Sequence, residues 1–188
     1  MVQDLKKIKT MGGIGSILTL LGGLPYVGSL VYLAGEILVL IALWDLKKIT
    51  QEKSIFKNYL VGVILSSVGV IGLIIGIVLV SVGLIALFTR EASRESFEGR
   101  GMMPLAFSVL ILLFSWALFV FGNYLIMKSF KKVTEVTKEE KFATAGLLYF
   151  IGALTLILLV GALISFAGMI VTIVAFFSLP DKAEVQVA

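Results

Sequence analysis

Four long apolar blocks are the feature of this sequence that most constrains its fold. They cover residues 11–44, 59–88, 103–127 and 142–179. Each block exceeds the roughly 20 apolar residues that an α-helix needs to cross a bilayer. Because backbone N–H and C=O groups in hydrocarbon must be satisfied within their own segment, these blocks should be helical. The sequence therefore predicts an all-α, polytopic transmembrane helical bundle.

Composition supports the same class of protein and argues against several others. Hydrophobic residues make up 59% of the chain and charged residues 15%, and the mean hydropathy is +1.08. Soluble domains average about 45–50% apolar and about 25% charged residues. The absence of cysteine and histidine excludes disulfides, thiolate chemistry and imidazole metal ligands. No nucleophile with its base, phosphate-binding loop or metal cluster stands out, so we expect neither enzyme activity nor a cofactor.

The block lengths predict about six helices, within a range of five to seven. As one helix the first block would be ~51 Å long, against a hydrocarbon core of ~30 Å, so it must turn back. Gly22, Gly23 and Pro25 mark the turn, since proline cannot continue a helix without losing a backbone bond. We therefore expect helices over residues 5–21 and 26–44.

The last block resembles the first when the two are aligned without gaps. Three glycines then recur at a constant offset, pairing Gly13 with Gly146, Gly28 with Gly161 and Gly35 with Gly168. Such self-similarity suggests an internal repeat. By analogy with the first block, we expect helices over residues 142–158 and 161–179. The bundle would then have related N- and C-terminal hairpins.

A glycine stripe favours one continuous helix over residues 59–88. It consists of glycines spaced every seven residues, namely Gly62, Gly69, Gly76 and Gly83. Small residues let membrane helices approach closely, so we interpret the stripe as a helix-packing device. The helix expected over residues 103–127 carries a ridge at the same spacing, formed by Phe107, Phe114 and Phe121. We expect this ridge to face the glycines of an antiparallel neighbour.

Lysine clusters at residues 4–8, 45–49 and 129–133 set the expected orientation. Short loops rich in Lys or Arg stay cytoplasmic, so both termini should be cytoplasmic and the loop over residues 89–102 should lie outside. The clusters should also contact the anionic head groups of membrane lipids. A partner role for nucleic acid is not expected from such short clusters.

The clusters also divide the chain, which we expect to form a single integral membrane domain over residues 1–188. A first hairpin covers residues 1–49, the third and fourth helices lie within residues 50–128, and a last hairpin covers residues 129–188.

Glu36 is the one charged residue well inside an apolar block. An ionisable group at that depth costs about 2.5–3.5 kcal/mol on insertion scales and usually faces the bundle interior. Ser29 and Tyr32 share its helical face, so the three residues form a candidate intramembrane polar site. Since the apolar blocks offer no cation, we expect a protonated carboxyl that is hydrogen-bonded to a neighbouring helix. A proton or cation site is the alternative.

Further hydroxyl groups lie in the apolar blocks and could line a path with Glu36. They belong to Ser66, Ser67, Ser81, Ser108, Ser115, Thr155, Ser165 and Thr172. Serine and threonine in membrane helices more often bond to the carbonyl four residues earlier, and we expect this here.

Two stretches resemble a known family. They are LKKIKTMGGIGSIL at residues 5–18 and AFFSLP at residues 175–180. Both are similar to a family of small archaeal membrane proteins called domain of unknown function (DUF) 996, and the likeness covers nearly the whole chain. The resemblance implies an archaeal cell-membrane location. It implies no functional residues, because the family has no established activity.

The features together favour a structural or interaction component of the cell membrane. Its expected partners are membrane lipids and either further copies of the chain or other membrane subunits. The alternative is a small transporter or channel subunit that uses Glu36 as a proton or cation site.

Overall fold

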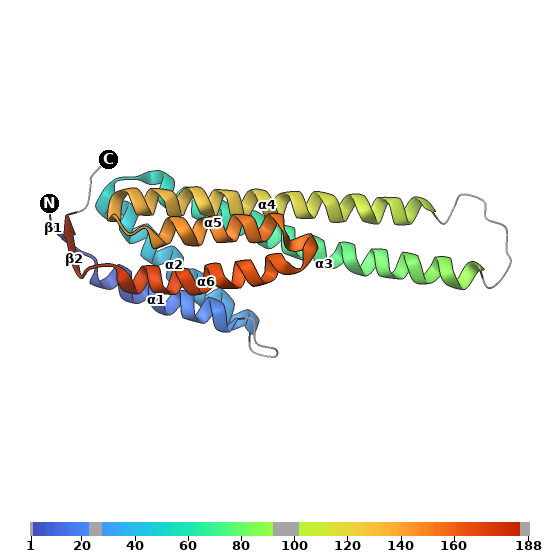
Figure 1. Ribbon diagram of the computed structural model, residues 1–188, viewed down its shortest axis with the longest axis horizontal. Coiled ribbons are helices and arrows are strands. Elements are labelled where there is room, and N and C mark those ends of the chain that lie inside the picture. The colour runs from blue at the N-terminus through green and yellow to red at the C-terminus, as the bar shows by residue number, and fades with distance from the viewer. Residues whose placement is uncertain (1, 23–27, 92–101, 185–188) are drawn as a thin grey trace. The chain divides into compact units, whose positions relative to one another are not determined.

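The computed structural model describes residues 2–22, 28–91 and 102–184, and within them it contains six α-helices (Figure 1). The helices are α1 (Lys6–Leu21), α2 (Gly28–Thr50), α3 (Lys53–Glu91), α4 (Met102–Thr137), α5 (Lys141–Leu154) and α6 (Val160–Ser178). Three short elements complete these ranges, namely β1 (Val2–Asp4), the 3-10 helix η1 (Leu156–Leu158) and β2 (Lys182–Glu184). The predicted all-α class with about six helices is confirmed. The turn predicted at Gly22, Gly23 and Pro25 lies largely outside the described residues.

Four of the described helices are long and apolar enough to cross a membrane, namely α2, α3, α4 and α6. The other two are shorter, with 16 residues in α1 and 14 in α5. In contrast, α3 and α4 have 39 and 36 residues, which correspond to ~58 and ~54 Å at 1.5 Å per residue. Both extend beyond the predicted boundaries, because the helices continue through the polar, lysine-bearing segments that flank the apolar blocks.

The chain divides into two compact units. Unit 1 comprises residues 1–63 and 123–188, and unit 2 comprises residues 64–122. In unit 1, α1 packs against α2, α5 against α6, and α1 against α6. Unit 2 contains α3 from residue 64 to its end and α4 from its start to residue 122. The predicted single domain with its three sections stays a prediction.

The core of unit 1 gathers at one end, where α1 and α3 begin and α2 and α4 end. We call this the lysine end, because the clusters at residues 4–8, 45–49 and 129–133 lie there. Phe130, Phe142 and Phe176 are fully buried in it. Their rings contact one another in series, at centroid distances of 5.6 Å between Phe130 and Phe142 and 4.9 Å between Phe142 and Phe176. These contacts join α4, α5 and α6.

Two short strands, which the sequence did not predict, join the chain ends at the lysine end. β1 and β2 lie side by side (Figure 1). They pair antiparallel, with Asp4 opposite Lys182. Lys9 Nζ adds an ion pair with Asp181 at 3.1 Å. Strands of three residues carry too little alternation to be recognised from sequence.

The turn between α5 and α6 lies close to where the repeat placed it. α5 ends at Leu154, η1 follows, and Leu159 adopts φ 60° before α6 begins. A side chain on Gly161 would collide with the carbonyl oxygen of Gly152, so the glycine lets the two helix ends meet. The predicted helix over residues 142–158 therefore stops early, because its last turn tightens into a 3-10 helix.

Candidate polar site and apolar groove

The carboxyl of Glu36 lies inside unit 1, where the side chain is hydrogen-bonded to a neighbouring helix. Glu36 is 9% exposed, and Tyr59 on α3 donates a hydrogen bond from its hydroxyl to Oε2 at 3.1 Å. Tyr32, one turn earlier on α2, interacts electrostatically with the same carboxyl. The carboxyl therefore links α2 to α3 through a phenol.

Packing around the carboxyl positions these partners. The ring of Tyr59 stacks on that of Phe130 with centroids 5.7 Å apart, which holds the hydroxyl in place. Gly35, also on α2, comes so close to α1 that a Cβ there would lie 2.6 Å from the carbonyl oxygen of Gly15. The close crossing of α1 and α2 therefore lies next to Glu36 in sequence.

A third tyrosine completes a cluster around the carboxyl. Tyr149 of α5 is partly buried and near enough for an electrostatic interaction with Glu36. The hydroxyls of Tyr149 and Thr172 lie 3.3 Å apart, and Thr172 donates to the carbonyl of Gly168 at 2.9 Å. We call Tyr32, Tyr59 and Tyr149 the tyrosine cluster.

Glu36 has no charged partner among the described residues. None of the ion pairs among the described residues includes it, and no group of three potential metal ligands occurs in the same part of the chain. Buried ionisable groups in membranes are normally paired with a partner, and the partners identified here are phenols. The arrangement can hold a proton on oxygen and join α2 to α3.

The sequence found some of these residues and missed others. Glu36 and Tyr32 interact as their spacing suggested, whereas Ser29 is exposed. Tyr59 and Tyr149 were not identified, although a tyrosine in an apolar segment signals a hydroxyl that needs a partner. The expected bonding to the carbonyl four residues earlier is present at Ser81, Thr155 and Thr172.

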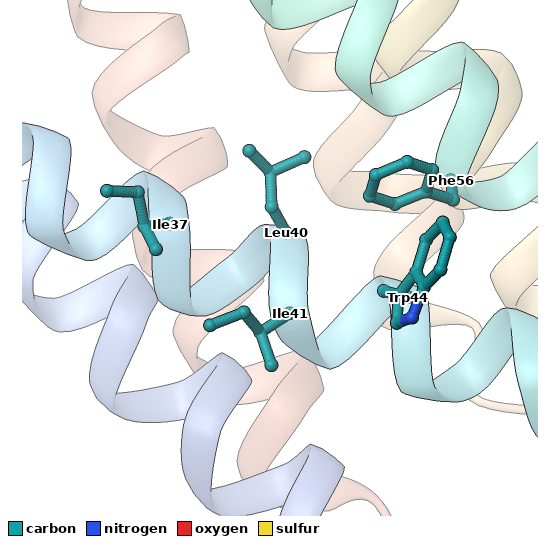
Figure 2. A pocket seen from close by; sticks show the side chains of 5 residues that line it. All are labelled: Ile37, Leu40, Ile41, Trp44 and Phe56. Carbon is teal, nitrogen blue, oxygen red and sulfur yellow. The ribbon is translucent and has the colours of Figure 1, made fainter.

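An apolar groove lies on another face of α2 in unit 1 (Figure 2). It has a volume of about 300 Å³ and is lined by Ile37, Leu40, Ile41 and Trp44 of α2 and by Phe56 of α3. The rings of Trp44 and Phe56 meet edge to face at 4.8 Å. Glu36 is not among the lining residues, so the groove and the polar cluster are separate features.

The glycine stripe contacts α4 within unit 2. A Cβ on Gly69 would lie 2.6 Å from the backbone nitrogen of Phe119, one on Gly76 would lie 3.1 Å from Leu112 Cβ, and one on Gly83 would lie 3.2 Å from Leu105 Cδ1. Gly62, in unit 1, is buried. The α4 residues that face the stripe in unit 2 therefore also recur every seven residues, as Leu105, Leu112 and Phe119.

The predicted phenylalanine ridge is wrong. Phe107, Phe114 and Phe121 are 66%, 67% and 53% exposed. Leu105, Leu112 and Phe119 lie two positions earlier along α4, and two positions rotate the helix by ~200°. Both sets recur every seven residues, so the spacing alone did not distinguish the packed face from the opposite one.

Comparison with known proteins gives a family without an assigned function. The model of a family described as a protein of unknown function (DUF996) matches residues 31–177. An uncharacterized protein of Methanocaldococcus jannaschii is 39% identical over 190 residues, which covers 97% of each chain. No solved structure matches the chain.

Proposed function

Since the chain belongs to the DUF996 family, whose function is unknown, we propose a role from its geometry: it is a structural or interaction component of the cell membrane. In this proposal Glu36 serves as a hydrogen-bonded link between helices. The observation that carries it is the bond from Tyr59 to Glu36, which leaves the carboxyl partnered by a neighbouring helix. A membrane protein is the class that the apolar helices and the family support.

The surroundings of Glu36 support a packing role more than a transport role. The carboxyl is 9% exposed, and the groove on α2 is lined by apolar side chains without it. A buried carboxyl with phenol partners stabilises a helix contact, because losing a partner would leave a buried polar group unsatisfied.

The orientation and the partners are part of the proposal. The chain crosses the membrane several times with both termini in the cytoplasm, since the lysine clusters of unit 1 lie at one end. Unit 2 presents apolar side chains such as Ile71, Ile74 and Leu110, which are 59%, 59% and 63% exposed. Lipid, another copy of the chain or another membrane subunit would cover them.

Transport is the second candidate function, and the tyrosine cluster is the observation that favours it. One carboxyl and several hydroxyls bring together oxygen atoms that can relay a proton or bind a cation. In that case Glu36 would change its protonation or its ligand during each cycle.

A flux assay on proteoliposomes separates the two roles. We expect no pH-dependent flux from the wild-type protein, and the same assembly and stability for Glu36→Gln, whose amide oxygen can still accept from Tyr59. Glu36→Leu should lower the free energy of unfolding by about 1–3 kcal/mol, because it leaves the Tyr59 hydroxyl unpaired. A pH-dependent flux that Glu36→Gln abolishes would overturn the structural role and support transport.

A further inference from the structure

The apolar groove is one continuous face of α2 that ends beside a lysine. Its four α2 residues follow the helical spacing i, i+3, i+4 and i+7 from Ile37 to Trp44. Lys47, one turn further, places Nζ 4.0 Å from the centroid of the Trp44 ring and 5.6 Å from that of Phe56. The apolar groove therefore ends beside a cation at the lysine end of unit 1.

The charge of Lys47 is available to a ligand. Asp45 pairs with Lys7 at 2.7 Å and with Lys48 at 3.8 Å. None of the ion pairs among the described residues uses Lys47. The mouth of the groove thus combines two aromatic rings with positive charge.

The length of the groove matches one leaflet of a bilayer. Lys47 follows Ile37 by ten residues along α2, so the groove together with the lysine covers ~15 Å of helix, which is half of a ~30 Å hydrocarbon core. Tryptophan concentrates at the boundary between hydrocarbon and head groups. Trp44, which is 38% exposed, is the last α2 residue that lines the groove before Lys47. Its indole N–H has no hydrogen-bond partner in the part of the chain that the structure describes.

We propose that this groove binds one anionic glycerolipid, with a hydrocarbon tail against Ile37, Leu40 and Ile41 and its phosphate at Lys47. The indole N–H of Trp44 donates to an oxygen of the lipid. The size favours a lipid over a partner helix, because a single ~5.4 Å turn of a helix ~10 Å wide already occupies ~400 Å³, whereas the groove has a volume of only about 300 Å³. The site is independent of the role proposed for Glu36.

Quenching of tryptophan fluorescence tests the site directly. The chain has two tryptophans, so Trp116→Phe leaves Trp44 as the only reporter in the full-length protein. This parent variant would be reconstituted in vesicles of phosphatidylcholine and phosphatidylglycerol, with either lipid brominated on its tails. Brominated phosphatidylglycerol should occupy the site about fivefold more than brominated phosphatidylcholine at equal mole fraction, the selectivity that one lysine supplies near anionic lipid.

Substitutions of lysine identify the residue that confers the selectivity. Lys47→Gln should bring the preference close to one, and Lys47→Arg should retain it. Lys128→Gln is the matched control, since Lys128 lies 5.1 Å from the ring of Tyr124 but outside the groove, and it should keep the fivefold preference. Equal quenching by both lipids in the parent variant, or an unchanged preference in Lys47→Gln, would overturn the proposal.

A second variant tests the position of the tail. Leu40→Phe narrows the groove and should weaken quenching of Trp44 by both brominated lipids. Leu110→Phe, on the exposed surface of unit 2, should not change it. Unchanged quenching in Leu40→Phe would show that the tail does not lie in the groove.

Discussion

Tyr59 Oη lies 3.1 Å from Glu36 Oε2, which joins α2 to α3 across the turn that Gln51 and Glu52 form. The two side chains are also both buried, at 5% and 9% exposure. A hydrogen bond in such surroundings matters most when one partner is removed, because the other then stays desolvated without a partner.

Removing the Tyr59 hydroxyl should therefore destabilise the protein. We expect Tyr59→Phe to lower the free energy of unfolding by about 1–2 kcal/mol, somewhat less than a complete loss because Tyr32 still reaches the carboxyl. Unfolding of the detergent-solubilised protein measures this. A double-mutant cycle with Glu36→Leu should give a coupling energy of at least ~0.5 kcal/mol. Additive effects would mean that the two side chains do not interact.

Two glycines of the stripe should respond differently to alanine. A Cβ on Gly69 would meet the backbone nitrogen of Phe119 at 2.6 Å, whereas a Cβ on Gly83 would meet the end of the Leu105 side chain at 3.2 Å. Backbone cannot move aside as a side chain can, so Gly69→Ala should destabilise by about 1–3 kcal/mol. Gly83→Ala should change the stability by less than about 1 kcal/mol. Thermal unfolding of both variants in one detergent would reveal a reversed order if the packing were different.

The turn before α6 contains a residue in a conformation that suits glycine. Leu159 has φ 60° and is 80% exposed, so its side chain contributes little packing within the chain. Leu159→Gly should raise the free energy of unfolding by up to about 1 kcal/mol, since the left-handed region costs an L-residue roughly 1–2 kcal/mol. Leu158 is 72% exposed and has no positive φ, so Leu158→Gly should be neutral or destabilising. Equal effects of the two substitutions would contradict this interpretation.

Glu52 should make the stability depend on acidic pH. Its carboxylate accepts hydrogen bonds from the hydroxyl of Ser54 at 2.7 Å and from the Ser54 backbone N–H at 3.1 Å, and these bonds lower the pKa of Glu52. A lowered pKa in the folded state contributes stability above the unfolded pKa, and this contribution is lost as pH falls through the folded value.

Thermal unfolding at pH 7 and at pH 3 measures this contribution. Wild-type protein should lose more stability between the two than Glu52→Gln, which has no carboxylate to protonate there. Glu139→Gln is the control for removing a carboxylate from a turn. Glu139 lies in the turn before α5, and its Oε1 is 2.8 Å from Lys141 Nζ. An equal loss in the wild type and in Glu52→Gln would show that Glu52 makes no such contribution.

Several features of the polar cluster followed from the sequence. Glu36 stood out because a charge at that depth is costly, and Tyr32 shares its helical face. Tyr59 and Tyr149 did not stand out in the sequence, because they come from α3 and α5 and meet Glu36 only when the helices pack. Helical spacing predicts neighbours within one helix and carries no information on neighbours from another.

The sequence by itself determined that the chain is helical and suited to a membrane, and about where its helices turn. The reason is local: in hydrocarbon each apolar segment must satisfy its own backbone hydrogen bonds, whatever lies beside it. Only the tertiary structure decided that Leu112 and not Phe114 faces Gly76, and that Tyr59 reaches Glu36. Two stripes with the same spacing are equivalent along one helix, and close packing against a second helix removes that equivalence.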